Sequence, residues 1–177
     1  MSALQTLNIL LVDDNQHMRA ITSAILQSAG IRKIREVSDG AMALDVMRDH
    51  EIDLAIVDFN MFPLDGVEFT RLVRNSPDSA NPYLPIIMMT GHSEKHRVVE
   101  ARDAGVTEFV VKPITAKAVF DRIQAVILRP RPFVKTDGYF GPDRRRTSAA
   151  NHYQGPRRRA SDVAEDVSTG KDGVRNA

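Results

Sequence analysis

Residues 52–66 read Ile-Asp-Leu-Ala-Ile-Val-Asp-Phe-Asn-Met-Phe-Pro-Leu-Asp-Gly. Leu54 to Val57 is a continuous apolar run that is too short for a helix, which is typical of a strand buried on both faces. The run ends on Asp58, and the residues after it have the turn chemistry of a loop that opens an amphipathic helix. Because ligands bind at the carboxyl ends of strands in an open α/β sheet, Asp58 is a candidate site residue.

The order of a short apolar segment followed by a segment with helical spacing recurs along residues 7–128. Strands are expected at 7–12, 33–37, 54–57, 86–89 and 108–111, and helices at 16–29, from Asp39 through Met47, and at 65–74, 94–104 and 115–128. Right-handed crossovers place such helices on both faces of a parallel sheet. The sequence therefore predicts an α/β, flavodoxin-like (βα)5 doubly wound fold with strand order 2-1-3-4-5.

Composition restricts the class of protein. The 177 residues are 42% hydrophobic and include no cysteine, which excludes disulfides and thiolate metal sites. No apolar stretch reaches the roughly 20 residues that span a bilayer, and no basic segment followed by an apolar one stands at the N-terminus. We expect a soluble, cytoplasmic protein.

Three carboxylates are expected to meet at one edge of the sheet, because Asp13 and Asp14 follow the first strand and Asp58 follows the third. Like charges this close persist only if a cation neutralises them or one carboxylate takes a proton. Oxygen ligands without nearby histidine or cysteine favour Mg²⁺. A carboxylate held beside a metal can attack a phosphoryl group, and Thr90 and Lys112, at the ends of the last two strands, can supply a hydrogen bond and a positive charge.

Other interpretations stand beside this one. Asp14 alone is as well explained as a cap of the helix that starts after it, and Asp65 as a cap of the third helix. An isolated Lys112 is usually a solvated lysine. The position of Lys112 at a strand end, before Pro113, favours the functional interpretation.

Residues 7–128 resemble a response-regulator receiver domain of two-component signalling, as in stand-alone chemotaxis regulators. The matching segments are Leu-Leu-Val-Asp-Asp-Asn (10–15), Val-Asp-Phe-Asn-Met (57–61), Leu-Asp-Gly (64–66), Met-Met-Thr-Gly (88–91) and Phe-Val-Val-Lys-Pro (109–113). The resemblance implies that Asp58 is the phosphoacceptor. It also implies that Asp13, Asp14, Asp58 and the backbone carbonyl of Asn60 bind Mg²⁺.

The resemblance assigns three further roles. Thr90 would be the switch hydroxyl that moves toward the phosphoryl group, Lys112 the lysine that pairs with it, and Phe109 the aromatic that turns inward. The Lys112–Pro113 peptide would be cis. One departure is Phe62, which stands where the family usually has proline. Phe62 is either a contact for a kinase or partner or a lid over the loop, and the lid is slightly favoured.

The function implied is a single-domain response regulator, a phosphoprotein that takes its phosphoryl group from a histidine kinase or phosphotransfer protein. It would catalyse only its own phosphorylation and dephosphorylation, and would signal through the face formed by residues 94–104, 108–111 and 115–128. A phosphatase with an aspartyl nucleophile is a weaker alternative, because its Asp-x-Asp usually follows the first strand whereas Asp58-Phe-Asn follows the third.

Residues 129–177 differ in composition and are expected to be a mostly disordered basic tail, after a receiver domain at 1–128. Residues 1–128 hold 13 Lys and Arg against 17 Asp and Glu, while residues 129–177 hold 11 against 6. Tyr-Phe-Gly-Pro-Asp-Arg-Arg (139–145) recurs as Tyr-Gln-Gly-Pro-Arg-Arg-Arg (153–159).

The duplication favours a docking motif for an acidic protein surface, which includes the receiver itself. Its candidate contact residues are Tyr139, Arg144, Arg145, Tyr153, Arg158 and Arg159. The alternatives are a solubilising tail, attachment to acidic lipid, and a receiver-controlled regulator that binds nucleic acid through the arginines.

Overall fold

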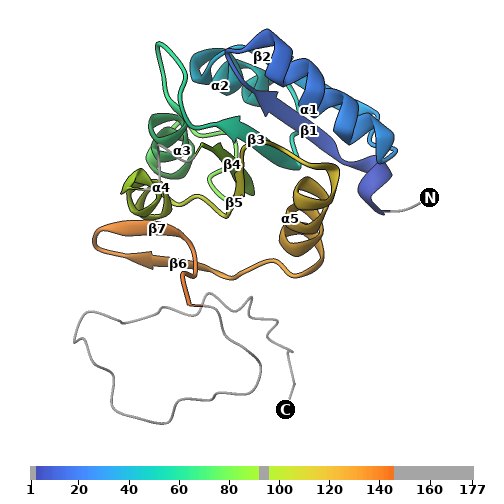
Figure 1. Cartoon of the computed structure of the whole chain (residues 1–177). Helices are drawn as coiled ribbons and strands as arrows, with labels where there is room; N and C mark the ends of the chain where they lie inside the picture. The colour runs from blue at the N-terminus through green and yellow to red at the C-terminus, as the bar shows by residue number, and fades with distance from the viewer. Residues whose placement is uncertain (1–2, 92–95, 146–177) are drawn as a thin grey trace, which may run out of the picture.

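The computed structural model describes residues 3–91 and 96–145. The elements are η1 (Ala3–Thr6), β1 (Asn8–Val12), α1 (Gln16–Ser28), β2 (Lys33–Val37), α2 (Gly40–Asp49), β3 (Leu54–Asp58), α3 (Gly66–Asn75), β4 (Ile86–Thr90), α4 (Val98–Ala104), β5 (Glu108–Val111), α5 (Ala116–Leu128), β6 (Phe133–Thr136) and β7 (Tyr139–Pro142). Within these residues, β1 to β5 form a parallel sheet in the order β2-β1-β3-β4-β5 (Figure 1). The predicted fold class and strand order are confirmed.

Helices α1, α2, α3 and α5 follow residues whose side chains accept hydrogen bonds from N–H groups of the first turn, which would otherwise be unpaired. These capping residues are Asn15 for α1, Asp39 for α2, Asp65 for α3 and Thr115 for α5. Asn15, rather than Asp14, caps α1, so the side chain of Asp14 is not needed for that helix.

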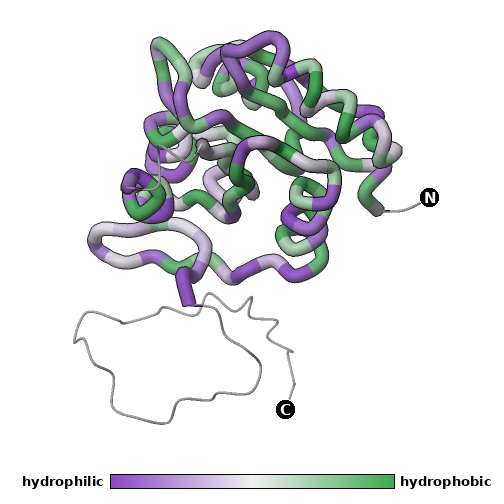
Figure 2. The backbone as a smooth tube through the Cα atoms, viewed as in Figure 1, coloured by the Kyte–Doolittle hydropathy of each residue, from purple (hydrophilic) through white to green (hydrophobic). Residues whose placement is uncertain are grey.

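Alternate side chains of the strands enter different layers, as the pleat requires. Ile9 and Leu11 of β1 pack with α1 and α5, whereas Leu10 and Val12 pack with α2 and α3. Hydrophobic residues accordingly gather along the strands in the middle of the fold (Figure 2). The helices thus cover both faces of the sheet and leave the strand ends open to side chains that follow them.

The structure corrects the predicted boundary at residue 128. β6 and β7 pair antiparallel, and Phe133 and Phe140 pack against Tyr83 with ring centroids 5.1 and 5.3 Å from that ring. The hairpin lies beside α4 (Figure 1). The region expected to be a mostly disordered tail therefore contains folded structure at 133–142. The two strands of the hairpin have four residues each, which is too short to show a periodic pattern. Their aromatic partner, Tyr83, lies about 50 residues earlier in the sequence.

Arg74 of α3 is a buried cation beneath this hairpin, with 3% of its surface exposed. Its Nε donates to the carbonyl of Gly105 at 3.1 Å and its Nη1 to that of Pro82 at 2.8 Å. The guanidinium lies 5.0 Å from the ring centroid of Phe133. Burial lowers the pKa of Arg74 to about 10, so it stays protonated at neutral pH. Arg74 therefore links α3, the end of α4 and the hairpin.

Candidate functional site

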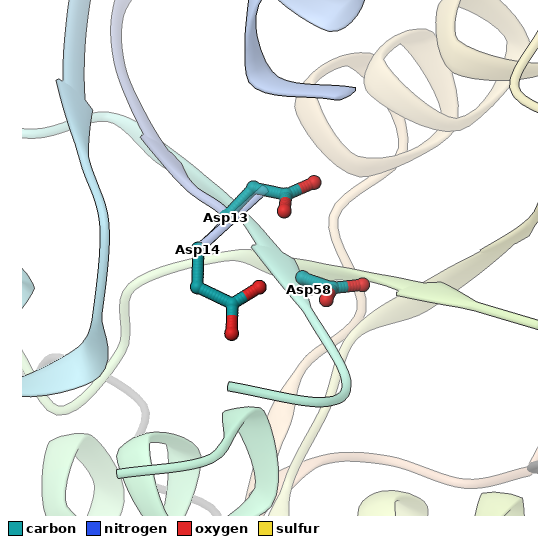
Figure 3. A group of neighbouring side chains, drawn as sticks. All are labelled: Asp13, Asp14 and Asp58. Carbon is teal, nitrogen blue, oxygen red and sulfur yellow. The ribbon is translucent and has the colours of Figure 1, made fainter. Parts of the chain in front are cut away.

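The register of the sheet brings the predicted site residues to one edge. Val12 pairs with Val57, Asp58 with Met89, and Thr90 with Val111, so the chain leaves β1, β3, β4 and β5 at the same end. One carboxylate oxygen from each of Asp13, Asp14 and Asp58 lies within 4.8 Å of the other two. Figure 3 shows the three side chains beside one another at the ends of β1 and β3.

Asp13 is buried and incompletely hydrogen-bonded. Its Oδ1 accepts the backbone N–H of Asn15 at 2.8 Å, whereas its buried Oδ2 has no hydrogen-bond partner among the described residues. Burial raises the pKa of Asp13, against the opposing effect of the Asn15 N–H. A buried carboxylate oxygen without a partner is costly unless a cation occupies the site, so this oxygen fits a metal ligand.

Asp58 is 4% exposed and lies against Lys112, whose Nζ is 2.5 Å from Asp58 Oδ1. Burial raises the pKa of Asp58 to about 6, although the hydrogen bond and charge of Lys112 act to lower it, and the charge of Asp13 raises it further. The carboxylate is thus desolvated but paired with a cation, which keeps it available as an anion near neutral pH.

Thr90 and Lys112 end neighbouring strands. Thr90 is 3% exposed, and its carbonyl accepts the Lys112 backbone N–H at 2.7 Å. The Lys112–Pro113 peptide is cis, as the resemblance implied, and so is the Phe62–Pro63 peptide. The structure therefore places a hydroxyl and an amine on the β4 and β5 side of Asp58.

Asn60 and Phe109 lie in the loop after β3 and in β5, respectively. Asn60 is exposed in the loop after β3. Phe109 is half-buried in β5, and its side chain packs against a cluster that includes Phe59 after β3 and residues of β4, α3 and α4. Phe109 thus belongs to the strand that leads to Lys112, and it packs against the cluster that includes Ala101 and Ala104 of α4.

The structure adds two residues that the sequence analysis did not single out. A Cβ on Gly66 would lie 2.4 Å from the carbonyl oxygen of Asp58, so the turn after Asp58 requires glycine. The Leu-Asp-Gly segment was the available signal. Arg97 stacks over Phe59 at 4.6 Å and pairs with Asp65 at 3.3 Å. Arg97 also pairs with Glu100 three residues on, but its contacts with Phe59 and Asp65 come from segments distant in sequence, which gave no signal.

Phe62 is 83% exposed, so the favoured interpretation of a lid over the loop is wrong. The side chain extends from a loop that begins beside Asp58 and whose far end, at Gly66, is tied to Phe59 by a backbone hydrogen bond. A bulky apolar group exposed to water four residues after Asp58 is available for contact with a partner.

The predicted tail contacts are only partly within the described residues. Tyr139, Arg144 and Arg145 lie in or just after β7, and Arg144 Nη1 is 2.8 Å from Asp103 Oδ1 of α4. Tyr153, Arg158 and Arg159 lie outside the described residues. In the portions of the chain that the structure describes, no helix combines the length and apolar character needed to cross a membrane.

Comparisons with known proteins identify the family. The model of the response regulator receiver domain matches residues 9–124. The chemotaxis protein CheY of Pseudomonas aeruginosa is 33% identical over 123 residues, which cover 70% of this chain and 98% of that protein. CheY-3 of Vibrio cholerae is 30% identical over 125 residues, covering 71% and 95%.

Solved structures with a similar fold are also response regulators or receiver domains. CheY4 of Vibrio cholerae has a TM-score of 0.60 and 31% identity, covering 67% of this chain and 96% of that one. The receiver domain of the sensor histidine kinase PA1611 of Pseudomonas aeruginosa, with a magnesium ion coordinated in its active site cleft, has a TM-score of 0.60 and 27% identity, covering 67% and 94%. This chain therefore belongs to the response-regulator receiver family of two-component signalling.

Proposed function

We propose that this protein is a single-domain, cytoplasmic response regulator that accepts a phosphoryl group on Asp58 from a histidine kinase or phosphotransfer protein. The observation that carries the proposal is the position of Asp58, which is paired with Lys112 and grouped with Asp13 and Asp14. Family membership supports it, because phosphoryl acceptance on aspartate is general among receiver domains.

The residues that would hold Mg²⁺ are Asp13, Asp14, Asp58 and the backbone carbonyl of Asn60. The donor set is all oxygen, and the unpartnered, buried Oδ2 of Asp13 fits a cation ligand. When bound, the ion would neutralise the carboxylates and stabilise negative charge on the phosphoryl oxygens.

The side chains of Asp58 and Lys112 then explain how the phosphoryl group is accepted. Lys112 pairs with one oxygen of Asp58, which leaves the other oxygen for attack on phosphorus. A bond forms between that oxygen and phosphorus as the P–N bond of the donor phosphohistidine breaks, and the electron pair of the broken bond leaves with the imidazole. Lys112 stays beside the group and offsets its charge.

Signal output would follow from the added charge. The acyl phosphate places roughly −2 charge at the end of β3. Thr90 would move toward it to donate a hydrogen bond, and Phe109 would turn inward into the space released. The partner affinity of the face formed by α4, β5 and α5 would change, which is a shift between two populated states.

The test is transfer from a small phosphodonor such as acetyl phosphate in the presence of Mg²⁺, followed by intact-mass measurement. Unaltered protein and Asp45→Asn, a control at an exposed carboxylate on α2, should each gain one phosphoryl group. Asp58→Asn should gain none. Equal labelling of Asp58→Asn would overturn the assignment of the phosphoacceptor.

The alternative of a nucleic-acid-binding regulator has less support. Arg144, one arginine of the first repeat, is paired with Asp103 and stacked on Tyr139, so protein contacts engage it. Salt-dependent DNA binding that disappears when residues 139–159 are deleted would favour this alternative.

A further inference from the structure

The repeat in the C-terminal region has one copy in the structure and one outside it. The first copy spans residues 139–145 and includes β7; the second spans 153–159. Both copies share Tyr, Gly-Pro and two arginines at identical spacing. The contacts of the first copy therefore show what the shared residues do.

Gly141 lets the two backbones approach closely. A Cβ on Gly141 would lie 2.6 Å from the hydroxyl oxygen of Tyr139 in the same hairpin and 2.9 Å from the Cα of Gly105, the residue that follows α4. A Cβ on Gly105 would in turn lie 3.0 Å from the carbonyl oxygen of Phe140. A larger side chain at either position would push the hairpin away from α4, so the shared glycine is a docking requirement.

A chain of contacts that runs from Tyr139 and Pro142 to Arg144 links the first copy to α4. The hydroxyl of Tyr139 donates to the carbonyl of Pro142 at 2.7 Å, and the guanidinium of Arg144 lies 3.9 Å from the Tyr139 ring centroid. Arg144 then pairs with Asp103 at 2.8 Å. Tyrosine, proline and arginine, three of the shared residues, thus work together at this contact.

The receiving surface consists of Asp103, Gly105 and Arg74, and we call it the α4-end surface. Asp103 supplies a carboxylate, Gly105 a flat backbone and Arg74 a buried cation beneath the aromatic ring of Phe133. Its carboxylate complements the arginine of the motif.

We propose that the second copy, residues 153–159 of the same chain, also binds the α4-end surface and does so in exchange with the first copy. By analogy with the first copy, Gly155 would then lie against Gly105, and Arg158, stacked on Tyr153, would pair with Asp103. This inference concerns the surface and its ligand, and is independent of phosphorylation at Asp58.

The first copy is the favoured occupant. Phe140 packs against Tyr83 and Phe133, and the second copy has Gln154 at that position. The first copy also follows β6 through a tight turn at 137–138, whereas the second would close a longer loop, which costs more entropy. The second copy therefore replaces the first when the first is displaced, and its short connection to the hairpin keeps its local concentration high.

Replacement of the first copy by the second would affect β5 and α4 of the receiver through the contacts of the hairpin. Arg131, before β6, pairs with Glu108 at the start of β5, and Arg144 pairs with α4. Undocking the first copy removes a restraint on these elements, and docking the second restores part of it. The surface thus accepts peptides of the form Tyr-x-Gly-Pro-x-Arg, with two in the same chain.

The test uses the full chain in four forms: unaltered, Gly141→Val, Gly155→Val and the double variant. Hydrogen exchange is followed by mass spectrometry in peptides that cover 153–159 and 98–105. In Gly141→Val, exchange in 153–159 should slow by about tenfold relative to unaltered protein, as expected for a segment docked about nine tenths of the time. The double variant should lose this protection, and its 98–105 peptide should exchange faster than in either single variant.

Two controls keep the result interpretable. Unchanged exchange in β3 and β4 shows that each variant is folded, and Tyr139→Ala provides a second way to displace the first copy. In the Gly141→Val background, Asp103→Ala should reduce protection of 153–159, whereas Asp45→Ala should not. Identical exchange of 153–159 in Gly141→Val and the double variant would overturn the proposal, and protection that rises with protein concentration would overturn the assignment to the same chain.

Discussion

Lys112 Nζ lies 2.5 Å from Asp58 Oδ1, so an amine from the end of β5 pairs with a carboxylate from the end of β3. β4 separates these strands in the sheet, and the carbonyl of Thr90, at its end, accepts a hydrogen bond from the Lys112 backbone N–H. The pair therefore spans three adjacent strand ends. This arrangement makes the charge of Asp58 sensitive to anything that moves the β5 loop.

Replacing Lys112 with Gln should slow phosphorylation of Asp58 by about tenfold or more, because the charge that offsets the incoming phosphoryl group is lost. The rate is measured with acetyl phosphate and Mg²⁺ by intact mass. Lys117→Gln is the matched control, since Lys117 is an exposed lysine of α5 that pairs with exposed Asp121, away from Asp58. An unchanged rate in Lys112→Gln would show that Lys112 does not assist transfer.

Replacing Asp13 with Asn should make the metal-free protein as stable as the unaltered one or more stable, because it removes one of three crowded negative charges. The same change should remove stabilisation by Mg²⁺, which for unaltered protein is about 3 kcal/mol at a hundredfold excess over the dissociation constant. Thermal unfolding with and without Mg²⁺ measures both effects, with Asp45→Asn as control. Equal gains from Mg²⁺ in Asp13→Asn would exclude Asp13 as a ligand.

Replacing Gly66 with Ala should destabilise the fold by roughly 1–3 kcal/mol, because the new Cβ would overlap the Asp58 carbonyl and force the backbone to shift. Gly138→Ala is a matched control, since a Cβ there meets nothing within 4 Å. Urea unfolding compares the two. Phosphorylation of Gly66→Ala should also slow, and a stability equal to that of Gly138→Ala would contradict the packing argument.

Replacing Phe62 with Ser should change stability by no more than about 0.5 kcal/mol, because the ring is almost fully exposed. Transfer from a phosphorylated kinase domain or phosphotransfer protein should slow, whereas transfer from acetyl phosphate should not. The two rates, measured on the same variant, separate partner docking from chemistry. Leu128→Ser, another exposed apolar side chain, is the control. Equal slowing with both donors would place Phe62 in the chemistry instead.

Local sequence predicted the strands and most helix starts well. β2 and β5 coincide with their expected ranges, Asp65 caps α3 as expected, and Asp39 and Thr115, the starts of two expected helices, cap α2 and α5. These features depend on neighbouring residues, since strand burial shows as an apolar run and capping depends on a side chain two or three positions away. The helix expected at 94–104 is described from Val98 on, because 92–95 lie outside the described residues.

By itself, the sequence determined the α/β class, the strand order and the identity of the residues at the strand ends. Only the tertiary structure decided that Asp13 has an unpartnered buried oxygen, that Phe62 is exposed, and that the chain folds on past Leu128 into a hairpin. The physical reason is the distance in sequence between the interacting residues. Strands and caps are set by residues close in sequence, whereas the burial of one carboxylate oxygen and the docking of Gly141 on Gly105 depend on distant segments meeting in space.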